Sequence, residues 1–339
     1  MKPFFLGLSR DLLNAQGKAS FGDGPLELLN QQSHIQWEFM PESVREITPQ
    51  IMARYDAIHI SSPKVTAQSL AGDAQRVKLV SRHGVGYDSV DVRSLAQAGV
   101  ITTNTPKAVR RPVAVAALSF IFALAGRLFT KDRLVREGRW LERNNHMGLG
   151  LTTRTLGIVG VGGIGKELLA LAKPFGWRML ASDPHVDASV IESLGAEKTD
   201  FDRLLAESDF VVATLILDEH THHWFNASAF AKMKPQAFFI NMARGGVVDE
   251  HALIQALEQK QIAGAGLDVF EQEPIASSNP LLRMEQVLLT PHALCWTDEC
   301  FDAIAREGLG NVIAFSRGER PASVVQADSS IPSSSSIKR

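Results

Sequence analysis

A glycine-rich turn between a short apolar run and a helical stretch constrains the fold of this chain more than any other feature. Residues Thr155–Val159 are predicted to form a buried strand, the sequence GVGGIG follows directly, and residues 166–175 have helical spacing. In this order, Gly160 permits the tight turn, Gly162 lets a ligand approach the backbone, and Gly165 lets the helix pack closely on the strand. The phosphates of a dinucleotide are then held by backbone N–H groups at the positive end of the helix.

The next predicted strand, 178–181, is followed by a carboxylate that selects among dinucleotides. Asp183 lies eighteen residues beyond Gly165, where an acidic side chain accepts hydrogen bonds from ribose hydroxyls and repels a 2′-phosphate. Pro184 and His185 come next, so no arginine is positioned there to bind such a phosphate. The segment therefore predicts a Rossmann domain that binds NAD in preference to NADP. We assign these residues of the segment to the cofactor site: Gly160, Gly162, Gly163, Ile164, Gly165 and Asp183.

Apolar runs alternate with helical patterns in two series along the 339 residues. The first series has predicted strands at 4–8, 35–39, 57–60, 78–81 and 100–103, with helices near 25–32, 43–53, 66–75 and 89–98. The second has predicted strands at 155–159, 178–181, 210–215, 237–241, 263–269 and 287–289. Between the series we expect a long helix at 112–127 and a charged, irregular stretch to residue 153, and after them a helix at 297–316. Such alternation predicts an α/β fold with parallel sheets.

Composition excludes several classes of partner. The net charge of −2, from 35 basic and 37 acidic residues, comes without a basic stripe, so neither nucleic acid nor an anionic membrane is an expected partner. The apolar run Val113–Ala125 is shorter than the roughly 20 residues of a membrane span, and we expect a buried helix there. Cys295 and Cys300, placed on a predicted helix, lack metal or disulfide spacing, which is typical of a cytoplasmic protein. His220, His222 and His223 lack ligand partners at metal-binding spacing, so no metal site is predicted.

Three strands of the second series are followed by side chains suited to catalysis. Arg244 comes after the first of them, Asp268 and Glu273 come at the end of the next, and His292 follows the last. Ligands of open α/β sheets bind beyond the carboxyl ends of the strands, so these side chains are expected near the glycine turn. Glu271 is expected to be an ordinary solvated charge.

Four ordered motifs, followed by the tripeptide TPH (290–292), give the chain a family resemblance over roughly residues 50 to 318. They are HGVGYDSVDV (83–92), TLGIVGVGGIGKELL (155–169), INMARGGVVDE (240–250) and GLDVFEQEP (266–274). The chain thereby resembles the D-isomer-specific 2-hydroxyacid dehydrogenases, which include phosphoglycerate dehydrogenase and glyoxylate/hydroxypyruvate reductases. The resemblance implies two doubly wound parallel-sheet domains and a homodimer formed through the NAD domain. A Rossmann NAD domain at 105–293 would be inserted into a discontinuous flavodoxin-like substrate domain at 1–104 and 294–325. The tail at 326–339 is expected to be disordered because it is rich in serine and has nothing to bury.

The resemblance also implies a role for each strand-end side chain. Arg244 would bind the carboxylate and the 2-oxo oxygen of the substrate, and His292 would be the general acid in reduction and the base in oxidation. A carboxylate beside the imidazole would favour its protonated form. The 29-residue step from Arg244 favours Glu273 over Glu271 for this partner. The cofactor contacts implied in this region come from Ala243, Arg244, Asp268 and His292.

Other positions are assigned to the substrate or remain open. The backbone N–H groups of Val85 and Gly86 would bind the substrate carboxylate. Trp296 either walls the substrate pocket or packs in the core, and the two alternatives have equal weight. Arg110 and Arg111 open the long helix where many relatives carry acidic or small residues, and they face either the substrate or the surface.

The predicted activity is hydride transfer between NAD(H) and C2 of a small 2-oxo or D-2-hydroxy acid. The main alternative is an NAD-sensing, non-enzymatic protein of the corepressor type, which has no need of Arg244, Glu273 and His292. A relative of formate dehydrogenase is a third possibility, and Glu273 argues against it because that enzyme lacks the His–Glu pair. The sequence does not select among 2-oxo acids.

Overall fold

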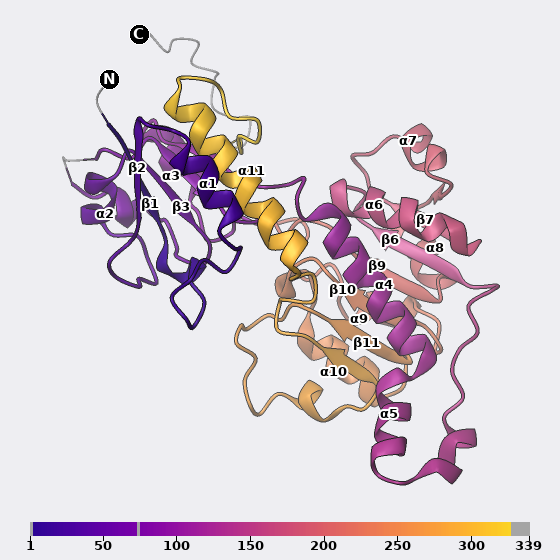
Figure 1. Ribbon diagram of the computed structural model, residues 1–339. Helices are drawn as coiled ribbons and strands as arrows, with labels where there is room; N and C mark the ends of the chain where they lie inside the picture. Colours follow the sequence, from indigo (N-terminus) through magenta and orange to yellow (C-terminus); the bar gives the residue numbers. More distant parts are fainter. Residues whose placement is uncertain (1–2, 73–74, 327–339) are drawn as a thin grey trace. The chain divides into compact units, whose positions relative to one another are not determined.

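The computed structural model describes residues 3–72 and 75–326, and the chain divides into two compact units (Figure 1). One unit comprises the described residues up to 109 and from 296 onward, and the other, inserted into it along the sequence, comprises residues 110–295. The sequence placed these boundaries at 104/105 and 293/294. The tail expected to be disordered lies outside the described residues from position 327 onward.

The first unit is built on a five-stranded parallel sheet. Its strands are β1 (Phe4–Leu8), β2 (Ile35–Phe39), β3 (Ala57–Ile60), β4 (Leu79–Arg82) and β5 (Ile101–Thr103), and its helices are α1 (Gly24–Asn30), α2 (Pro49–Arg54), α3 (Val92–Gln97) and α11 (Asp298–Ser316). The strand order β2-β1-β3-β4-β5 is that of flavodoxin-like folds. The side chains of successive residues in β3 and β4 point to opposite faces of the sheet and belong to different hydrophobic clusters. Ala57 and Leu79 pack with α1 and α11, whereas Ile58 and Val80 pack with α2 and α3.

The second unit contains a seven-stranded parallel sheet. Its strands are β6 (Thr155–Val159), β7 (Arg178–Ser182), β8 (Glu197–Lys198), β9 (Phe210–Ala213), β10 (Phe238–Asn241), β11 (Gly264–Leu267) and β12 (Val287–Leu289). Its helices are α4 (Arg110–Gly126), α5 (Leu128–Arg136), α6 (Gly163–Ala172), α7 (Ala188–Ser193), α8 (Phe201–Glu207), α9 (Ala227–Lys232) and α10 (Glu250–Glu258). The order β12-β11-β10-β9-β6-β7-β8 reverses direction between β6 and β9, as in Rossmann folds. The α/β class with two parallel sheets is thus confirmed.

Helices cover both faces of the seven-stranded sheet. Helices α8, α9 and α10 contribute buried side chains, among them Phe230 and Leu253, to one core with Val211 and Phe239 of the strands. Helix α4 packs against α6 and against β10 and β11. Its apolar residues between Val113 and Ala125 are mostly buried, as expected. Within the described residues no single helix is long and apolar enough to cross a membrane, although α4 and α5, bent by 57°, pass that test as a pair.

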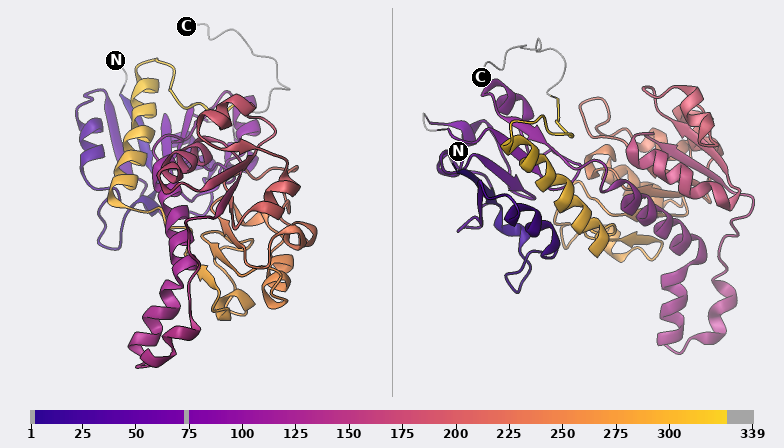
Figure 2. Two further views of the ribbon diagram at one scale, coloured as in Figure 1. Left: turned by 90° about the vertical axis from the view of Figure 1, so that its right-hand side faces the viewer. Right: turned by 45° about the horizontal axis from the view of Figure 1, so that its top comes forward.

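Several local predictions were wrong. The stretch expected to be irregular contains α5 and a 3₁₀ helix at Trp140–Asn145, which project from the rest of the unit in both views of Figure 2. Among the described residues of the predicted helix at 66–75, which exclude 73 and 74, only Ala67–Leu70 is helical, and it forms a 3₁₀ turn. The helix expected at 43–53 begins only at Pro49, because proline at the first position starts helices and disfavours helix before it. Cys295 precedes helix α11, so only Cys300 of the two cysteines is helical.

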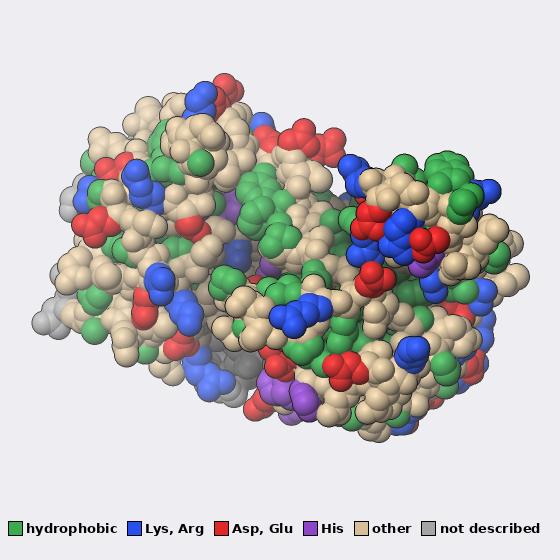
Figure 3. Space-filling model, turned by 90° about the horizontal axis from the view of Figure 1, so that it is seen from below, with side chains coloured by type: hydrophobic (Ala, Val, Ile, Leu, Met, Phe, Trp, Pro, Cys, Tyr) green, Lys and Arg blue, Asp and Glu red, His purple; other side chains and the backbone are tan. Residues whose placement is uncertain are grey.

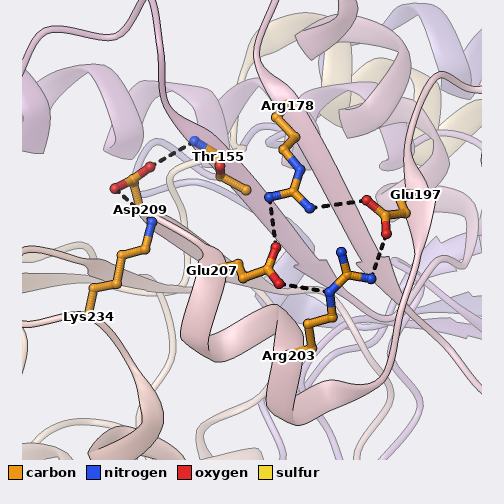
Figure 4. A network of polar contacts seen from close by, with 7 residues as sticks. All are labelled: Thr155, Arg178, Glu197, Arg203, Glu207, Asp209 and Lys234. Atoms are coloured by element: carbon orange, nitrogen blue, oxygen red, sulfur yellow. Dashed lines mark hydrogen bonds and ion pairs between the residues drawn. The ribbon is translucent and has the colours of Figure 1, made fainter.

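Charged side chains at the amino edge of the seven-stranded sheet form a closed ring (Figure 4). Arg178 pairs with Glu197 and Glu207, and Arg203 pairs with the same two carboxylates at 2.6 to 3.1 Å. These side chains are 34 to 47% exposed, so the ring contributes little to stability despite its geometry. On the face seen in Figure 3, acidic and basic side chains are interspersed, in keeping with the net charge of −2.

Candidate active site

The register of the seven-stranded sheet aligns the carboxyl ends of five strands. Val159, Ala213, Asn241, Leu267 and Leu289 pair in one continuous row across β6, β9, β10, β11 and β12. All the strands are parallel, so the segments that follow this row emerge at one edge. They are the glycine turn and the loops that carry Arg244, Asp268 and His292, so the sheet gathers the predicted side chains of this unit.

The glycine turn has the shape that a dinucleotide requires. Gly160 has a φ of 91°, and a side chain there would meet the backbone of Leu215. A side chain on Gly165 would collide with the carbonyl oxygen of Gly160, so this position keeps α6 close to β6. A Cβ on Gly162 would instead meet no atom within 4 Å, and Gly162 immediately precedes the N-terminus of α6, where an anion can bind backbone N–H groups. The chemistry of these residues fits the diphosphate of a dinucleotide.

Asp183 is fixed immediately beside this turn. Its Oδ2 accepts a hydrogen bond from the N–H of Val161 at 2.7 Å, and its Oδ1 accepts one from the N–H of His185 at 2.8 Å. Each oxygen retains a further lone pair for a ribose hydroxyl. The carboxylate therefore has a defined orientation at the end of β7, while the side chain itself is only partly buried.

The loop after β10 holds Arg244 through a buried amide. Asn241 accepts from the N–H of Ala243 and donates through Nδ2 to the carbonyl oxygen of Arg244, each at 3.0 Å. Gly245 has no room for a side chain because a Cβ would collide with the carbonyl group of Phe270. The guanidinium of Arg244 donates from Nη1 to the carbonyl oxygen of Ala243 at 2.7 Å. Arginine is thus presented from a rigid loop at the carboxyl end of the sheet.

His292 and Glu273 form a hydrogen-bonded pair. The Nδ1 of His292 lies 2.9 Å from Oε2 of Glu273, and the other oxygen of Glu273 accepts from the N–H of Phe270 at 3.0 Å. Both side chains are about two-fifths exposed. Because Nδ1 is engaged, Nε2 is the ring nitrogen left to exchange a proton with a ligand.

The charge state of Glu273 is set by this environment. Burial alone would raise the pKa of its carboxyl group. Hydrogen bonds from His292 and from the N–H of Phe270, together with the positive charge of Arg244, outweigh burial and lower that pKa below its ordinary value. Glu273 is therefore ionised throughout the neutral range and presents a negative charge to the imidazole.

Asp268 holds the segment that carries the histidine. Its Oδ1 accepts hydrogen bonds from the hydroxyl of Thr290 at 2.6 Å and from the N–H groups of Ala293 and Leu294 at 2.9 and 3.0 Å. The side chain is buried. His292 lies inside this clamp with a φ of 54°, a left-handed conformation that is uncommon for a residue with a side chain. Strained backbone of this kind persists only where its surroundings hold it, and it is concentrated at functional sites.

Comparison with known proteins identifies the family. Residues 118–293, just over half of the chain, match the family model described as "D-isomer specific 2-hydroxyacid dehydrogenase, NAD binding domain". The chain belongs to this family. It is therefore an NAD(P)-dependent D-2-hydroxyacid dehydrogenase, and the predicted family and enzyme class are confirmed.

Individual relatives agree with this assignment. A glyoxylate reductase of Korarchaeum cryptofilum is 41% identical over 258 residues, covering 75% of this chain and 78% of the relative. A crystal structure of a glyoxylate reductase from Paecilomyes thermophila has a TM-score of 0.82 at 28% identity and covers 96% of this chain and 99% of that one. A D-lactate dehydrogenase of Aquifex aeolicus, crystallised with NAD and lactic acid, has a TM-score of 0.80 at 26% identity and covers 93% and 96% of the two chains.

The remaining predicted site residues of this dehydrogenase lie in the five-stranded unit. Val85 and Gly86 are in the loop after β4, and the carbonyl oxygen of Val85 accepts a hydrogen bond from Asn104 at 2.7 Å. Trp296 is 59% exposed and contacts the ring of Phe301 edge-on at 5.0 Å. The alternative in which Trp296 packs in the core is therefore wrong.

The contacts of Glu271 and His223 differ from expectation. Glu271 is not an isolated solvated charge, because its Oε1 lies 2.6 Å from Nε2 of His223 and also accepts from the N–H of Glu250. His223 in turn stacks on His222 at 3.9 Å. Among the described residues no cluster of His, Cys, Asp or Glu is arranged to hold a metal ion.

Sequence reasoning missed the supporting residues of the site. Asn241 and Thr290 were seen only as parts of motifs, and Asp268 was assigned to the cofactor without its role as the clamp on the histidine loop. A polar residue at the carboxyl end of a fully apolar strand is the signal that could have found Asn241, since a buried amide must satisfy its hydrogen bonds locally.

Proposed function

We propose that the protein reduces a small 2-oxo acid with NADH, with glyoxylate as the first substrate to test. Relatives that cover most of the chain include glyoxylate reductases. The observation that carries the proposal is the His292–Glu273 hydrogen bond of 2.9 Å at the same sheet edge as Arg244. An NAD sensor of the corepressor type would need neither the pair nor the arginine.

Arg244, His292 and Glu273 have different tasks in the proposed reaction. Bound NADH supplies the hydride that C2 of the substrate accepts. Arg244 binds the substrate carboxylate and carbonyl oxygen through its fork of N–H donors. Nε2 of His292 donates the proton that the carbonyl oxygen takes up, and Glu273 stabilises the imidazolium before that transfer. In oxidation the same nitrogen removes the hydroxyl proton.

The other predicted contacts complete the proposal. The Rossmann unit would bind the cofactor through the glycine turn, Ala243 and Asp268. The five-stranded unit would bind substrate, with the N–H groups of Val85 and Gly86 as candidate donors to its carboxylate. The exposed indole of Trp296 is a candidate for a wall of the substrate pocket.

A substrate panel tests the proposed function. Glyoxylate, hydroxypyruvate, pyruvate and phosphohydroxypyruvate are assayed with NADH and with NADPH by the loss of absorbance of the reduced nicotinamide. We expect the highest kcat/KM with glyoxylate or hydroxypyruvate and NADH. Binding of NADH without turnover of any member would instead support the sensor alternative.

We further propose that Asp183 gives NADH its preference over NADPH. Asp183→Asn removes the charge that repels a 2′-phosphate but keeps one oxygen as an acceptor for the loop N–H groups. We expect the ratio of kcat/KM for NADH to that for NADPH to fall about tenfold, the scale of one charged hydrogen bond. An unchanged ratio would show that Asp183 does not discriminate between the ribose hydroxyl of NADH and the 2′-phosphate of NADPH.

A homodimer formed through the Rossmann unit is also proposed. A groove of about 830 Å³ runs between α5 and the segment before β12, and Phe129 and Leu282 in its lining are exposed. Basic and acidic side chains also line it, among them Arg136 and Asp132. The exposed apolar side chains and the groove belong to the same region of the surface. In a dimer with two-fold symmetry, the apolar side chains of each copy would therefore pack into the groove of the other copy.

Light scattering after size exclusion tests the dimer. We expect a mass of twice the 37.0 kDa of one chain, and a shift toward a single chain for Phe129→Asp, which places a charge in the apolar contact. Ile216→Asp is the matched control, since Ile216 is 71% exposed but lies in the loop after β9. A wild-type protein that elutes as a monomer at micromolar concentration would contradict the proposal.

A further inference from the structure

Arg110, the first residue of α4, lies directly against the glycine turn. A Cβ built on Gly163 would lie 2.6 Å from Nε of Arg110 and 3.1 Å from its Cδ. The arginine side chain therefore occupies the space that a side chain at position 163 would fill. Gly163 is the first residue of α6, so this contact places a guanidinium over the first turn of the helix that receives the dinucleotide.

The position of Arg110 is fixed by the packing of two helices. Helices α4 and α6 lie against one another, and α4 is anchored by a buried apolar face that includes Ala117 and Ile121. The next residue, Arg111, makes a separate contact, an ion pair of 2.9 Å with Glu167 one turn further along α6. The two neighbouring arginines thus meet α6 at different places. Arg111 ties the helices together, whereas Arg110 reaches the glycine turn.

The electrostatics of this turn favour an anion. The first N–H groups of α6 have no acceptor within the helix, and the helix dipole adds positive potential at the same point. The side chains from Gly160 to Gly165 carry no charge, and Lys166 adds a positive one. A guanidinium placed here adds charge and planar donors at the point where the family's NAD-binding domain receives a diphosphate.

We propose that Arg110 binds the diphosphate of the dinucleotide and that Gly163 lacks a side chain to make room for it. The inference rests on the proposed use of NADH and assigns to this chain a positioning residue outside the glycine motif. The sequence left open whether Arg110 faces the substrate or the surface. The proposal replaces both alternatives with a contact to the cofactor.

Equilibrium binding to the full-length protein tests the proposal without turnover. NADH is titrated by its fluorescence, and ADP-ribose, which has the diphosphate but no nicotinamide, is titrated as a competitor. We expect Arg110→Gln to raise the Kd of both ligands about tenfold and Arg110→Lys to raise it less, because lysine keeps the charge but loses the fork. Arg111→Gln is the matched control, with an expected change of less than about twofold.

Salt dependence separates a phosphate contact from a structural effect. A cation that neutralises phosphate makes binding weaken with added salt, so the Kd of the wild type should rise more steeply between low and high KCl than that of Arg110→Gln. Equal slopes, or an unchanged Kd in Arg110→Gln, would overturn the proposal. Equal weakening by Arg111→Gln would also overturn it, since the effect would then come from helix packing.

A double-mutant cycle tests the pairing with Gly163. Gly163→Ala should displace Arg110 and weaken NADH binding in the wild-type background, and should have a smaller effect when Arg110 is already Gln. Identical effects of Gly163→Ala in the two backgrounds would show that the glycine is not needed to make room for the side chain of Arg110. If the wild type binds NADH but the Arg110 variants do so equally well, this inference fails and the proposed function stands. If the wild type binds no NADH, both fail.

Discussion

Replacing His292 by alanine is expected to lower kcat for glyoxylate reduction by about 10³-fold, the scale of a lost general acid. The imidazole is placed by two independent contacts, the hydrogen bond to Glu273 and the clamp of Asp268 on its loop. Neither contact supports the glycine turn, so the Kd for NADH should stay within about twofold of the wild type. Steady-state kinetics and NADH fluorescence titration measure the two quantities separately.

Variants near His292 sharpen this prediction. Glu273→Gln keeps the shape of the side chain but removes the negative charge beside the imidazole, so it should lower kcat by a smaller factor, about 10- to 100-fold. His251→Ala is the control, because His251 lies exposed on α10, where its contact is to Gln255. If His292→Ala retained turnover, or if it lost NADH binding, the assignment of His292 as the general acid would be contradicted.

The lowered pKa of Glu273 sets the direction of one pH effect. A carboxyl group whose pKa is lower in the folded protein stabilises the fold above its unfolded pKa. That contribution is lost as the pH falls through the folded pKa. The His292–Glu273 contact should therefore persist across neutral and mildly acidic pH and weaken only below the ordinary range of a carboxyl group.

Arg244→Lys is expected to lower kcat/KM for glyoxylate by about 10³-fold, because lysine keeps the charge but cannot form the paired N–H contacts of a guanidinium. The loop geometry should survive, since Asn241 holds the backbone of residues 243 and 244 rather than the side chain. Part of the loss should appear in KM, through the substrate carboxylate, and part in kcat, through the carbonyl oxygen. Steady-state kinetics with varied glyoxylate separates the two.

Chemical rescue distinguishes a missing guanidinium from a disturbed loop. Added guanidinium ions should restore part of the activity of Arg244→Ala, because they supply the missing planar donors while Asn241 still holds the backbone of the loop. They should have no such effect on His292→Ala. A fully active Arg244→Lys variant would contradict direct contact between the guanidinium and the substrate.

The strands could be predicted because their signal is local. Strands such as β1, β6 and β12 are short apolar runs bounded by polar or turn residues, and their observed limits match the predicted ones. Helix limits were less predictable where packing decides them. Helix α5 follows α4 after a residue with a φ of 49°, a turn that ordinary helical spacing does not signal. Leu128 and Phe129 of α5 are exposed, so this helix does not have the apolar stripe that marks a buried helix in a sequence.

The candidate site was predictable where parallel topology governs it. Once the strands are known, the row from Val159 to Leu289 forces the loops that follow to one edge. The supporting contacts were not predictable, since they depend on which hydrogen bonds each buried group finds. Asp268 meets the loop of His292 across 22 to 26 residues of sequence, a separation at which no local pattern exists. The contact between Arg110 and Gly163 likewise depends on the packing of α4 on α6.

The most direct test of the proposed function is a single turnover. Wild-type protein carrying NADH is mixed with excess glyoxylate, and the absorbance of the reduced nicotinamide is followed while glycolate is quantified. We predict that NADH is consumed in a glyoxylate-dependent phase and that one glycolate forms for each NADH lost. Bound NADH that stays unchanged with glyoxylate, and with the other 2-oxo acids of the panel, would contradict the assignment as a reductase.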